Sequence, residues 1–522
     1  MTESQRAEFR ASLPPDAEQR WAACGRRIAV VLSGGGARGA YEAGVLLAFQ
    51  DARLPTHILA ATSIGSINAA SYAAHSSSVV GNAEHMVQSW SEVTPAAVGI
   101  DWTRYIFMLA GLVAATAGLG NLLAQALQES NIAIHLSHPK LTWGMLALAG
   151  VAVLLLYDQV TYVGYVLGNL LSGSAWKPDR RKLVLSLAAN LVVWSCVVLS
   201  LVSARLHLLG LVMLLSPREK LLVAALALAL AALGWILRQP ASFASHKFLR
   251  LPLRSGLFPN YERTRFLRDR LAAAGLRASP IRVVMTAAEV QSGEESYFTN
   301  TAREQLLCDP GVDPGFVQTE IEECSDLLQA VIASSAFPLA YEVVPMQKRL
   351  WTDGGIVANQ PIRPAIRLGA DVLFLVMMEP RQQKGVEVRT FLDVGVRAID
   401  ILMAQNLKTD LENLAAINRL CELHAARLKV RPEQVRVDLG TRTYRYVKAF
   451  TVRPEQPLAA TVLDFDGKIT GPAIAQGYHD GGDAVRDFLR YLVGAPGGGL
   501  KYVLRFKAEA LSPDPERSEG PL

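Results

Sequence analysis

A serine on an expected tight turn is the residue of this chain best suited to nucleophilic chemistry. Ser63 follows a short apolar run, His57–Ala61, and precedes a stretch of small residues that begins at Gly65. A strand that turns sharply into a helix holds a serine hydroxyl above the edge of a sheet, and small neighbours are needed there. We therefore expect Ala61, Thr62 and Gly65 to form a nucleophile elbow around Ser63, although Ala61 stands where a glycine is usual.

A glycine-rich segment, Gly34–Gly39, follows a second apolar run, Ile28–Leu32. Glycines after a strand let backbone amides approach an anion closely. The segment lacks the final Gly-Lys-Ser/Thr of a nucleotide phosphate loop, and the acidic residue of a dinucleotide site does not follow it. The remaining interpretation of the segment is an oxyanion hole for acyl transfer. Its expected residues are Gly34, Gly35, Gly36, Arg38 and Gly39. Arg38 would contact a lipid headgroup phosphate or brace the segment, and we favour the brace.

An aspartate before two glycines, Asp353, is the expected base for Ser63. A carboxylate takes a serine proton when a partly dry site raises its pKa or gives it a very short hydrogen bond. The rival arrangement is a Ser–His–Asp triad, whose histidine would lie late in the chain. That leaves His424 and His479, and we interpret both as structural or exposed. The dyad requires no metal and no other cofactor.

The elements that must position these residues follow the pattern of an α/β domain. Brief apolar runs bounded by turn residues predict buried strands, and apolar residues at helical spacing predict helices. Strands that alternate with helices predict a sheet with helices on its faces. We expect strands at Ile28–Leu32, His57–Ala61, Ile281–Ala287 and Val372–Met378, and helices at Ala40–Asp51, Gly65–Ala74, Phe391 to about Ala426, and near the end of 454–492.

A strongly apolar region interrupts this pattern. Four runs, residues 105–128, 141–171, 183–204 and 221–237, contain Asp158 as their single charged residue. A helix needs about 20 apolar residues to cross a bilayer, so we favour four transmembrane helices over helices buried in a soluble core. A shorter run, Leu206–Leu215, can belong to either neighbouring run and leaves the exact number of spans open. Basic residues flank the third run on its N-terminal side and the fourth on its C-terminal side. The positive-inside rule then places both basic clusters, and the α/β domain, in the cytoplasm.

These observations divide the chain into six expected parts. The catalytic domain is split by the apolar region, so its two halves must meet across a membrane insert. The parts are a polar lead-in at 1–25, the first half of the domain at 26–100, the membrane insert at 101–240, the second half at 241–385, a helical and mixed region at 386–510, and a disordered tail at 511–522.

Composition limits the classes of partner. The formal net charge is +5, which is too weak to indicate nucleic acid and suits an anionic membrane surface better. The five cysteines are scattered without close pairs, which argues against a zinc ribbon or a dense disulfide framework. Nothing in the sequence indicates an oligomeric state.

Taken together, the motifs resemble those of the patatin-like phospholipase family of the bacterial type. Gly34–Gly39 is similar to the family's G-G-G-x-R-G oxyanion loop, and Ser63–Ala70 is similar to its nucleophile elbow. Ser334–Pro338 resembles the block before the aspartate strand, and Asp353–Gly355 resembles the D-G-G/A motif of the dyad. Weaker similarity continues at Gly256–Phe258 and Asp410–Arg419, and the resemblance covers roughly residues 26–100 and 245–490.

The resemblance implies a serine acyl hydrolase that cleaves fatty acyl esters of phospholipids or lysophospholipids through the dyad of Ser63 and Asp353. It implies a patatin-like α/β sheet with flanking helices, and it does not extend to the apolar insert. With that insert, we expect an integral protein of a bacterial inner membrane whose catalytic domain lies on the cytoplasmic side. The alternative is a membrane scaffold or lipid-binding protein that retains the fold without catalysis, and Ala61 is the feature in its favour.

Overall fold

The computed structural model describes residues 2–100, 110–111, 113–115, 118, 144–153, 180–205, 256–258, 260–381, 391–438, 443–459, 462–494 and 502–505. The chain divides into two compact units. The larger unit comprises Met1–Ile100 with Arg254–Leu522, and the smaller is Asp101–Leu253.

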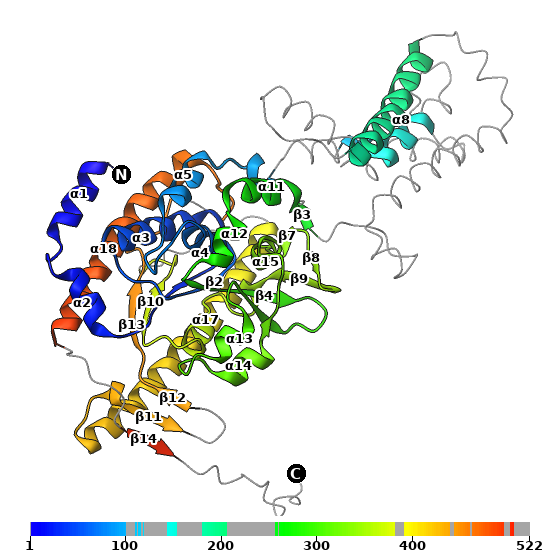
Figure 1. Cartoon of the computed structure of the whole chain (residues 1–522). Coiled ribbons are helices and arrows are strands. Elements are labelled where there is room, and N and C mark those ends of the chain that lie inside the picture. The colour runs from blue at the N-terminus through cyan, green and yellow to red at the C-terminus, as the bar shows by residue number, and fades with distance from the viewer. Residues whose placement is uncertain are drawn as a thin grey trace, which may run out of the picture. The chain divides into compact units, whose positions relative to one another are not determined.

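A central sheet organises the larger unit (Figure 1). In the described part of the chain its strands are β1 (Ile28–Leu32), β2 (Ile58–Thr62), β4 (Arg282–Glu289), β5 (Glu295–Thr299), β6 (Ile321–Glu322), β8 (Val344–Met346), β9 (Arg349–Asp353), β10 (Val372–Val376) and β13 (Lys448–Val452). The main order is β13-β10-β1-β2-β4-β5-β6, with β9 also paired to β4 and β8 to β9. The pairings from β13 to β4 are parallel, whereas β5 and β9 run antiparallel to β4.

The central strands are buried on both faces. Every residue of β1, β2 and β10 is buried, which explains why these strands are continuous apolar runs rather than alternating ones. The four expected strands are confirmed to within two residues at each end, and so is the mixed α/β class with a mainly parallel sheet.

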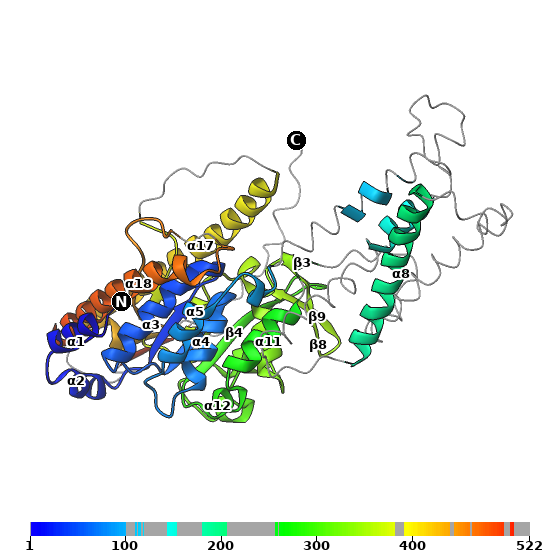
Figure 2. The same cartoon turned by 90° about the horizontal axis from the view of Figure 1, so that it is seen from above.

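Helices cover the two faces of the sheet. On one face lie α3 (Ala40–Asp51), α4 (Ile64–Ala74), α5 (Glu84–Glu92) and α18 (Gly467–Gly494), and Figure 2 shows α3, α4 and α5 side by side. Phe374 of β10 packs edge-on against Phe49 of α3 and Phe488 of α18, at centroid distances of 4.9 and 5.5 Å. These aromatic contacts fix α3 and α18 on the sheet.

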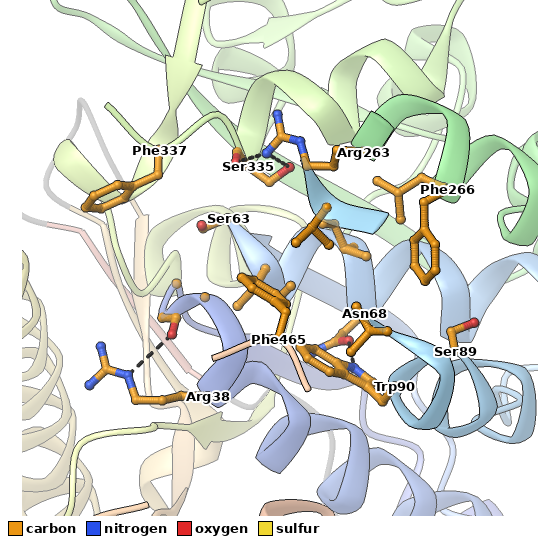
Figure 3. Close-up of a pocket in the computed structure, with 18 of the residues that line it drawn as sticks. Arg38, Ser63, Asn68, Ser89, Trp90, Arg263, Phe266, Ser335, Phe337 and Phe465 are labelled. Carbon is orange, nitrogen blue, oxygen red and sulfur yellow. Dashed lines mark hydrogen bonds between the residues drawn. The ribbon is translucent and has the colours of Figure 1, made fainter. Parts of the chain in front are cut away.

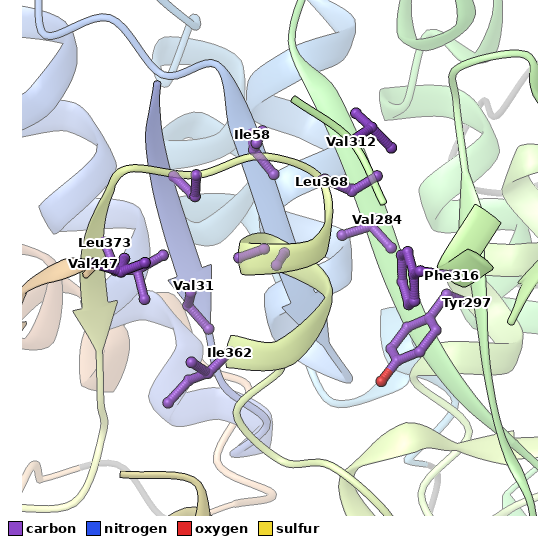
Figure 4. Close-up of a cluster of buried hydrophobic side chains, with 14 of the residues drawn as sticks. Val31, Ile58, Val284, Tyr297, Val312, Phe316, Ile362, Leu368, Leu373 and Val447 are labelled. Carbon is purple, nitrogen blue, oxygen red and sulfur yellow. The ribbon is translucent and has the colours of Figure 1, made fainter. Parts of the chain in front are cut away.

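The opposite face packs against α13 (Arg303–Leu307), α14 (Pro314–Thr319), α16 (Ile362–Arg367) and α17 (Phe391–Leu428). Figure 4 shows side chains of this core, among them Val31, Val284 and Phe316. Neighbouring strand residues point to opposite faces, so Ala29 and Val31 of β1 enter this core. The result is a three-layer α/β/α arrangement.

Smaller elements complete the larger unit. β3 (Gly256–Phe258) pairs with β7 (Leu339–Tyr341), and α11 (Asn260–Arg270), α12 (Ala273–Ala278) and α15 (Leu327–Ser334) lie in the same part of the chain. Residues 1–25, expected as a polar lead-in, contain α1 (Glu3–Ser12) and α2 (Ala17–Cys24). Their buried Phe9 and Trp21 contact Tyr478 and Phe488 of α18, so these helices belong to the packed unit.

The expected helix from Phe391 is confirmed as α17, and the expected C-terminal helix as α18. The end of α17 packs through Cys421 and Ala425 onto a three-stranded sheet formed by β11 (Val435–Asp438), β12 (Thr443–Arg445) and β14 (Tyr502–Arg505). The tail expected to be disordered, 511–522, lies outside the described residues.

The smaller unit contains α8 (Arg180–Arg205), which buries Ala189 and Val193 against Ala152. Within the ranges described, no helix combines the length and the apolar character that a membrane crossing requires. The expectation of four transmembrane helices therefore has no support from the described helices. The run 221–237 and most of 105–128 and 141–171 lie outside those residues.

Candidate active site

Sheet topology brings the expected nucleophile and base together although 290 residues separate them. β2 pairs with the first part of β4 and ends with Thr62 opposite Thr286. β9 pairs with the last part of β4 and ends with Asp353 opposite Ala287. Since β5 occupies the other edge of β4, β2 and β9 end side by side on the same edge. Ser63 and Asp353 are thus neighbours by register.

Ser63 occupies the sharp turn between β2 and α4. Its backbone has φ 56° and ψ −126°, a region that a residue with a side chain enters only where the surroundings force it. Space for the turn depends on its neighbours, because a Cβ on Gly65 would lie 2.8 Å from the carbonyl oxygen and Cβ of Leu32. Ala61 fits as a fully buried residue of β2. The strained turn presents the Ser63 hydroxyl at the sheet edge.

A short hydrogen bond joins the two side chains. The Ser63 hydroxyl donates to Oδ2 of Asp353 at 2.5 Å, and the amide of Gly355 donates to Oδ1 at 2.7 Å. Asp353 is fully buried. Burial raises the pKa of Asp353 to about 6, against the opposing effects of the hydrogen bonds from Ser63 and Gly355 and of the positive charge of Arg263. Such a carboxylate is ionised at neutral pH and more basic than an exposed one.

The glycine loop lies beside this pair, and the backbone amides of its first three residues differ in their hydrogen-bond partners. The amide of Gly34 donates to Oδ1 of Asn359 at 2.9 Å, so it already has a partner. The described residues provide no acceptor for the amides of Gly35 and Gly36. Gly36 has φ 60°, and a Cβ there would lie 2.1 Å from the carbonyl oxygen of Val462. Two unpaired amides at the pocket wall are suited to bind a developing negative charge.

Arg38 and Gly39 support the loop. The Nε of Arg38 donates to the carbonyl of Gly35 at 3.3 Å, which fits a brace, and Arg38 also lines the pocket (Figure 3). Gly39 is absent from the pocket lining. A Cβ on Gly39 would lie 2.6 Å from the side chain of Ile64, so its role is close packing between the loop and α4.

The segment after α15 connects the two halves of the site. The hydroxyl of Ser334 accepts from the amide of Ser63 at 3.2 Å and pairs with the hydroxyl of Ser66 at 2.7 Å. Two residues later, the carbonyl of Ala336 accepts from the amide of Asp353 at 3.0 Å. One short segment therefore holds the backbone of both catalytic candidates.

An apolar pocket opens at Ser63 (Figure 3). The volume of the pocket, including its open mouth, is about 1150 Å³, slightly above the roughly 300–1,000 Å³ of most ligand sites. Its polar lining residues include Arg263, Asn68 and Ser89, and no carboxylate side chain lines it. Most of the apolar lining comes from in or near α4, α5, α11 and the C-terminal part: Ile64, Ile67, Met86, Trp90, Val93, Val98, Phe266, Leu267, Leu271, Val462, Leu463 and Phe465. The segment after α15 adds Phe337, Ala340 and Tyr341.

Histidines and metal ligands are not part of this pocket. None of the residues that line it is a histidine. His479 is largely exposed on α18, beside Asp480 and Asp483, and His424 lies on α17. Among the residues that the structure describes, no group of three His, Cys, Asp or Glu side chains is arranged to hold a metal ion.

Several residues of the site were not singled out from the sequence. The segment around Val462 and Phe465 covers the glycine loop, since the carbonyl of Val462 accepts from the amide of Ala37 at 2.9 Å. The ring of Phe465 stacks on that of Trp90, with 6.1 Å between the ring centroids. Arg263 lies on α11 together with several other arginines. Its position in the sequence gave no reason to expect that it, rather than one of the others, is buried at the site. Asn359 follows the Asp-Gly-Gly motif closely, which was the available signal for it.

Comparisons with known proteins agree with this geometry. The family model of patatin-like phospholipase matches residues 30–203 and 181–366. A lysophospholipase of Aspergillus terreus is 50% identical over 50 residues, which cover 10% of this chain and 3% of that protein. A lysophospholipase of Chaetomium globosum is 46% identical over 52 residues, with the same coverage. The chain thus matches only a small part of these relatives. They are fungal, and the expected bacterial type stays a prediction.

Among solved structures, VipD from Legionella pneumophila is similar over 88% of this chain and 67% of its own, at 13% identity and a TM-score of 0.30. A score this low does not establish a shared fold.

Proposed function

The chain belongs to the patatin-like phospholipase family, and we propose that it is a lipid acyl hydrolase that uses Ser63 as nucleophile and Asp353 as base. The observation that carries this proposal is the 2.5 Å hydrogen bond from the Ser63 hydroxyl to the buried Asp353 carboxylate. Ser63 lines an apolar pocket together with Gly35 and Gly36, whose amides have no acceptor among the described residues. Nucleophile, base, anion donors and acyl site are the parts that ester cleavage through an acyl-enzyme requires.

The proposed reaction has two halves. In the first, the Ser63 oxygen attacks the ester carbonyl while its proton passes to Asp353, and the carbonyl oxygen becomes an oxyanion held by the amides of Gly35 and Gly36. The bond to the alcohol then breaks, and Asp353 returns the proton to the leaving oxygen. In the second, water gives a proton to Asp353 and attacks the acyl group on Ser63. The fatty acid leaves, and the proton returns to Ser63.

Burial gives Asp353 the basicity that this role requires. An exposed aspartate has a pKa near 4 and is a poor acceptor for a hydroxyl proton. Burial raises the pKa of Asp353 to about 6, close to the pH at which the enzyme would work, where a general base is most effective. The carboxylate is still ionised at pH 7, so most molecules carry a competent base.

The apolar pocket supports a fatty acyl chain as the group transferred to Ser63. Large aliphatic and aromatic side chains line most of it, and burying an alkyl chain contributes about 0.8 kcal/mol per CH₂. Phospholipids and lysophospholipids are the proposed substrates, in agreement with the family and with the names of the fungal relatives.

A contact with the lipid surface through the smaller unit is part of the same proposal. On α8, Val184, Leu187, Leu191, Trp194 and Val198 follow one another at spacings of three and four residues and are 52 to 71% exposed. This spacing aligns them on one helix face, and exposed apolar patches mark interaction sites. Arg180, Arg181 and Lys182 begin the same helix and would suit anionic headgroups. Insertion of 101–240 into a bacterial inner membrane, with the catalytic unit on the cytoplasmic side, stays a prediction.

Hydrolysis by purified variants tests the proposed function. Wild type should release fatty acid from lysophospholipid micelles, and Ser63→Ala and Asp353→Asn should each reduce the rate by at least 10³-fold. Ser292→Ala, which changes an exposed serine in the turn between β4 and β5, should match wild type. If Ser63→Ala retains the wild-type rate, the proposal fails. If wild type does not hydrolyse lipid at all, the non-catalytic lipid-binding alternative is favoured.

A further inference from the structure

Arg263 of α11 is a buried cation for which the described part of the chain offers no ion-pair partner. Arg263 is 3% exposed, and its guanidinium forms no salt bridge with any carboxylate in the described residues. Its Nε atom is buried and has no hydrogen-bond partner. Burial lowers the pKa of Arg263 to about 10, so it remains charged at neutral pH. A buried charge is costly unless the surroundings stabilise it, so this arginine calls for an explanation.

The guanidinium binds the C-terminal end of α15. Its Nη1 donates to the carbonyl of Ser335 and to the Ser335 hydroxyl, the latter at 3.3 Å, and its Nη2 donates to the carbonyl of Ile332 at 3.1 Å. Nη2 also donates to Asn260 at 2.6 Å, and the guanidinium lies 4.1 Å from the ring centre of Tyr341. Carbonyls at a helix C-terminus carry partial negative charge, which stabilises the cation in place of a carboxylate.

This helix end is the part of the fold that holds the catalytic candidates. Ser334, the last residue of α15, binds the amide of Ser63, and Ala336 binds the amide of Asp353. Arg263 binds Ser335, which lies between these two residues, and Ile332, which lies two residues before Ser334. A planar fork that reaches several oxygens at once is specific to arginine and is not reproduced by lysine.

Arg263 also lies near Asp353, because it binds Ser335 while the amide of Asp353 binds the next residue, Ala336. Besides the hydroxyl of Ser63 and the amide of Gly355, the charged group that acts on Asp353 is Arg263, whose positive charge lowers its pKa. No second carboxylate contributes. A cation in a buried site is screened weakly, so it acts on Asp353 without direct contact.

We propose that Arg263 is a positioning residue of the hydrolase: it fixes the end of α15 that holds Ser63 and Asp353, and its nearby charge favours the ionised form of the buried Asp353 carboxylate. The proposal rests on the hydrolase function proposed above. It assigns two separable tasks to one side chain, the fork that positions and the charge that favours the ionised base.

Two substitutions separate these tasks. Arg263→Lys keeps the charge and loses the fork, so kcat on a soluble short-chain ester should fall at least tenfold while the acid limb of the pH profile stays in place. Arg263→Gln keeps donors and loses the charge. The pKa of Asp353 should then rise, and the acid limb of the pH profile of kcat/KM should move to higher pH. Arg268→Met, on the exposed side of the same helix, should match wild type in both readings.

The outcomes distinguish this proposal from the one it rests on. Hydrolysis by wild type but not by Ser63→Ala establishes the enzyme independently of Arg263. With that shown, an acid limb in Arg263→Gln that coincides with the wild-type limb would overturn the charge role, because a merely structural residue would lower the rate at all pH values alike. A wild-type kcat in Arg263→Lys would overturn the positioning role, which is the core of the proposal, and this variant tests that role even if Arg263→Gln does not fold.

Discussion

At the scale of single residues, the account depends on one carboxylate whose environment makes it a base. Asp353 is fully buried, accepts hydrogen bonds from Ser63 and Gly355, and has a pKa raised to about 6 by burial. The same burial that raises its basicity also makes its charge costly. Catalysis and stability are therefore linked to the protonation of one group.

The activity should follow the ionisation of Asp353. Because the base must be unprotonated, kcat/KM on an uncharged short-chain ester should fall about tenfold per pH unit below pH 6 and should be level above it. The measurement is a pH–rate profile of wild type between pH 4.5 and 8. If the acid limb of this profile is centred near pH 4, the general base is not a buried carboxylate, and the role of Asp353 is contradicted.

The stability should change over the same range with the opposite sign. The folded-state pKa of Asp353 lies above its unfolded value, so the folded protein binds more protons between about pH 4 and 6. Asp353 thus stabilises the fold least at high pH, and its contribution to stability should decline as the pH rises through this window. The melting temperature of Asp353→Asn should lack this contribution, whereas Asp487→Asn, at an exposed position on α18, should keep the wild-type pH dependence.

At the scale of elements, the strand ends and the turns between them carry the site. The sequence predicted the strands, the elbow at Ser63 and the glycine loop, because short apolar runs and glycine turns are local signals. It did not predict that β9 pairs antiparallel to β4 beyond the end of β2, because strand pairing is a contact between distant segments. Nor did it single out Arg263, since α11 contains other arginines whose surroundings differ only in the folded chain.

Residues at the end of the chain show the same limit. Phe465 and Val462 cover the glycine loop, but their segment has no motif that associates it with Ser63. The amide of Gly34 was expected in the oxyanion hole, and its partner Asn359 was visible in the sequence. The sequence carries no signal for a hydrogen bond between those two positions. The structure was therefore needed to narrow the candidate oxyanion-hole amides to those of Gly35 and Gly36.

The turn at Ser63 gives a prediction at this scale. A Cβ on Gly65 would lie 2.8 Å from the carbonyl oxygen of Leu32, whereas a Cβ on Gly471 in α18 would meet nothing within 4 Å. Gly65→Ala should therefore lower the free energy of unfolding by about 1–3 kcal/mol and reduce kcat. Gly471→Ala should change the free energy of unfolding by less than about 1 kcal/mol, because its Cβ enters open space and the following Pro472 removes the usual helix gain of alanine. Thermal unfolding and ester hydrolysis measure both, and a Gly65→Ala protein as stable and active as wild type would refute the close packing.

At the scale of the whole molecule, the chain combines a catalytic unit with a second unit, Asp101–Leu253, whose helix α8 exposes apolar side chains. In the proposal, the first unit cleaves acyl esters and the second contacts the lipid surface. The two units should then respond to substitution in different assays.

Substitutions on α8 test this division of labour in the full chain. Leu191→Glu should reduce binding to anionic phospholipid vesicles at least fivefold in a flotation assay, because it places a charge in the apolar stripe, and it should leave hydrolysis of a soluble ester unchanged. Val493→Glu is a matched control, since Val493 is 71% exposed like Leu191 but lies on α18. Equal vesicle binding by Leu191→Glu and wild type would contradict the proposed contact.

The most direct measurement of the central claim is the site and rate of covalent labelling by a fluorophosphonate, which reacts with an activated serine. The account predicts that peptide mapping by mass spectrometry finds a single adduct on Ser63 in wild type. In Asp353→Asn the adduct should form at least a hundredfold more slowly, because the hydroxyl has lost its base. An adduct on another residue, or an equal rate of labelling in Asp353→Asn, would contradict the dyad of Ser63 and Asp353.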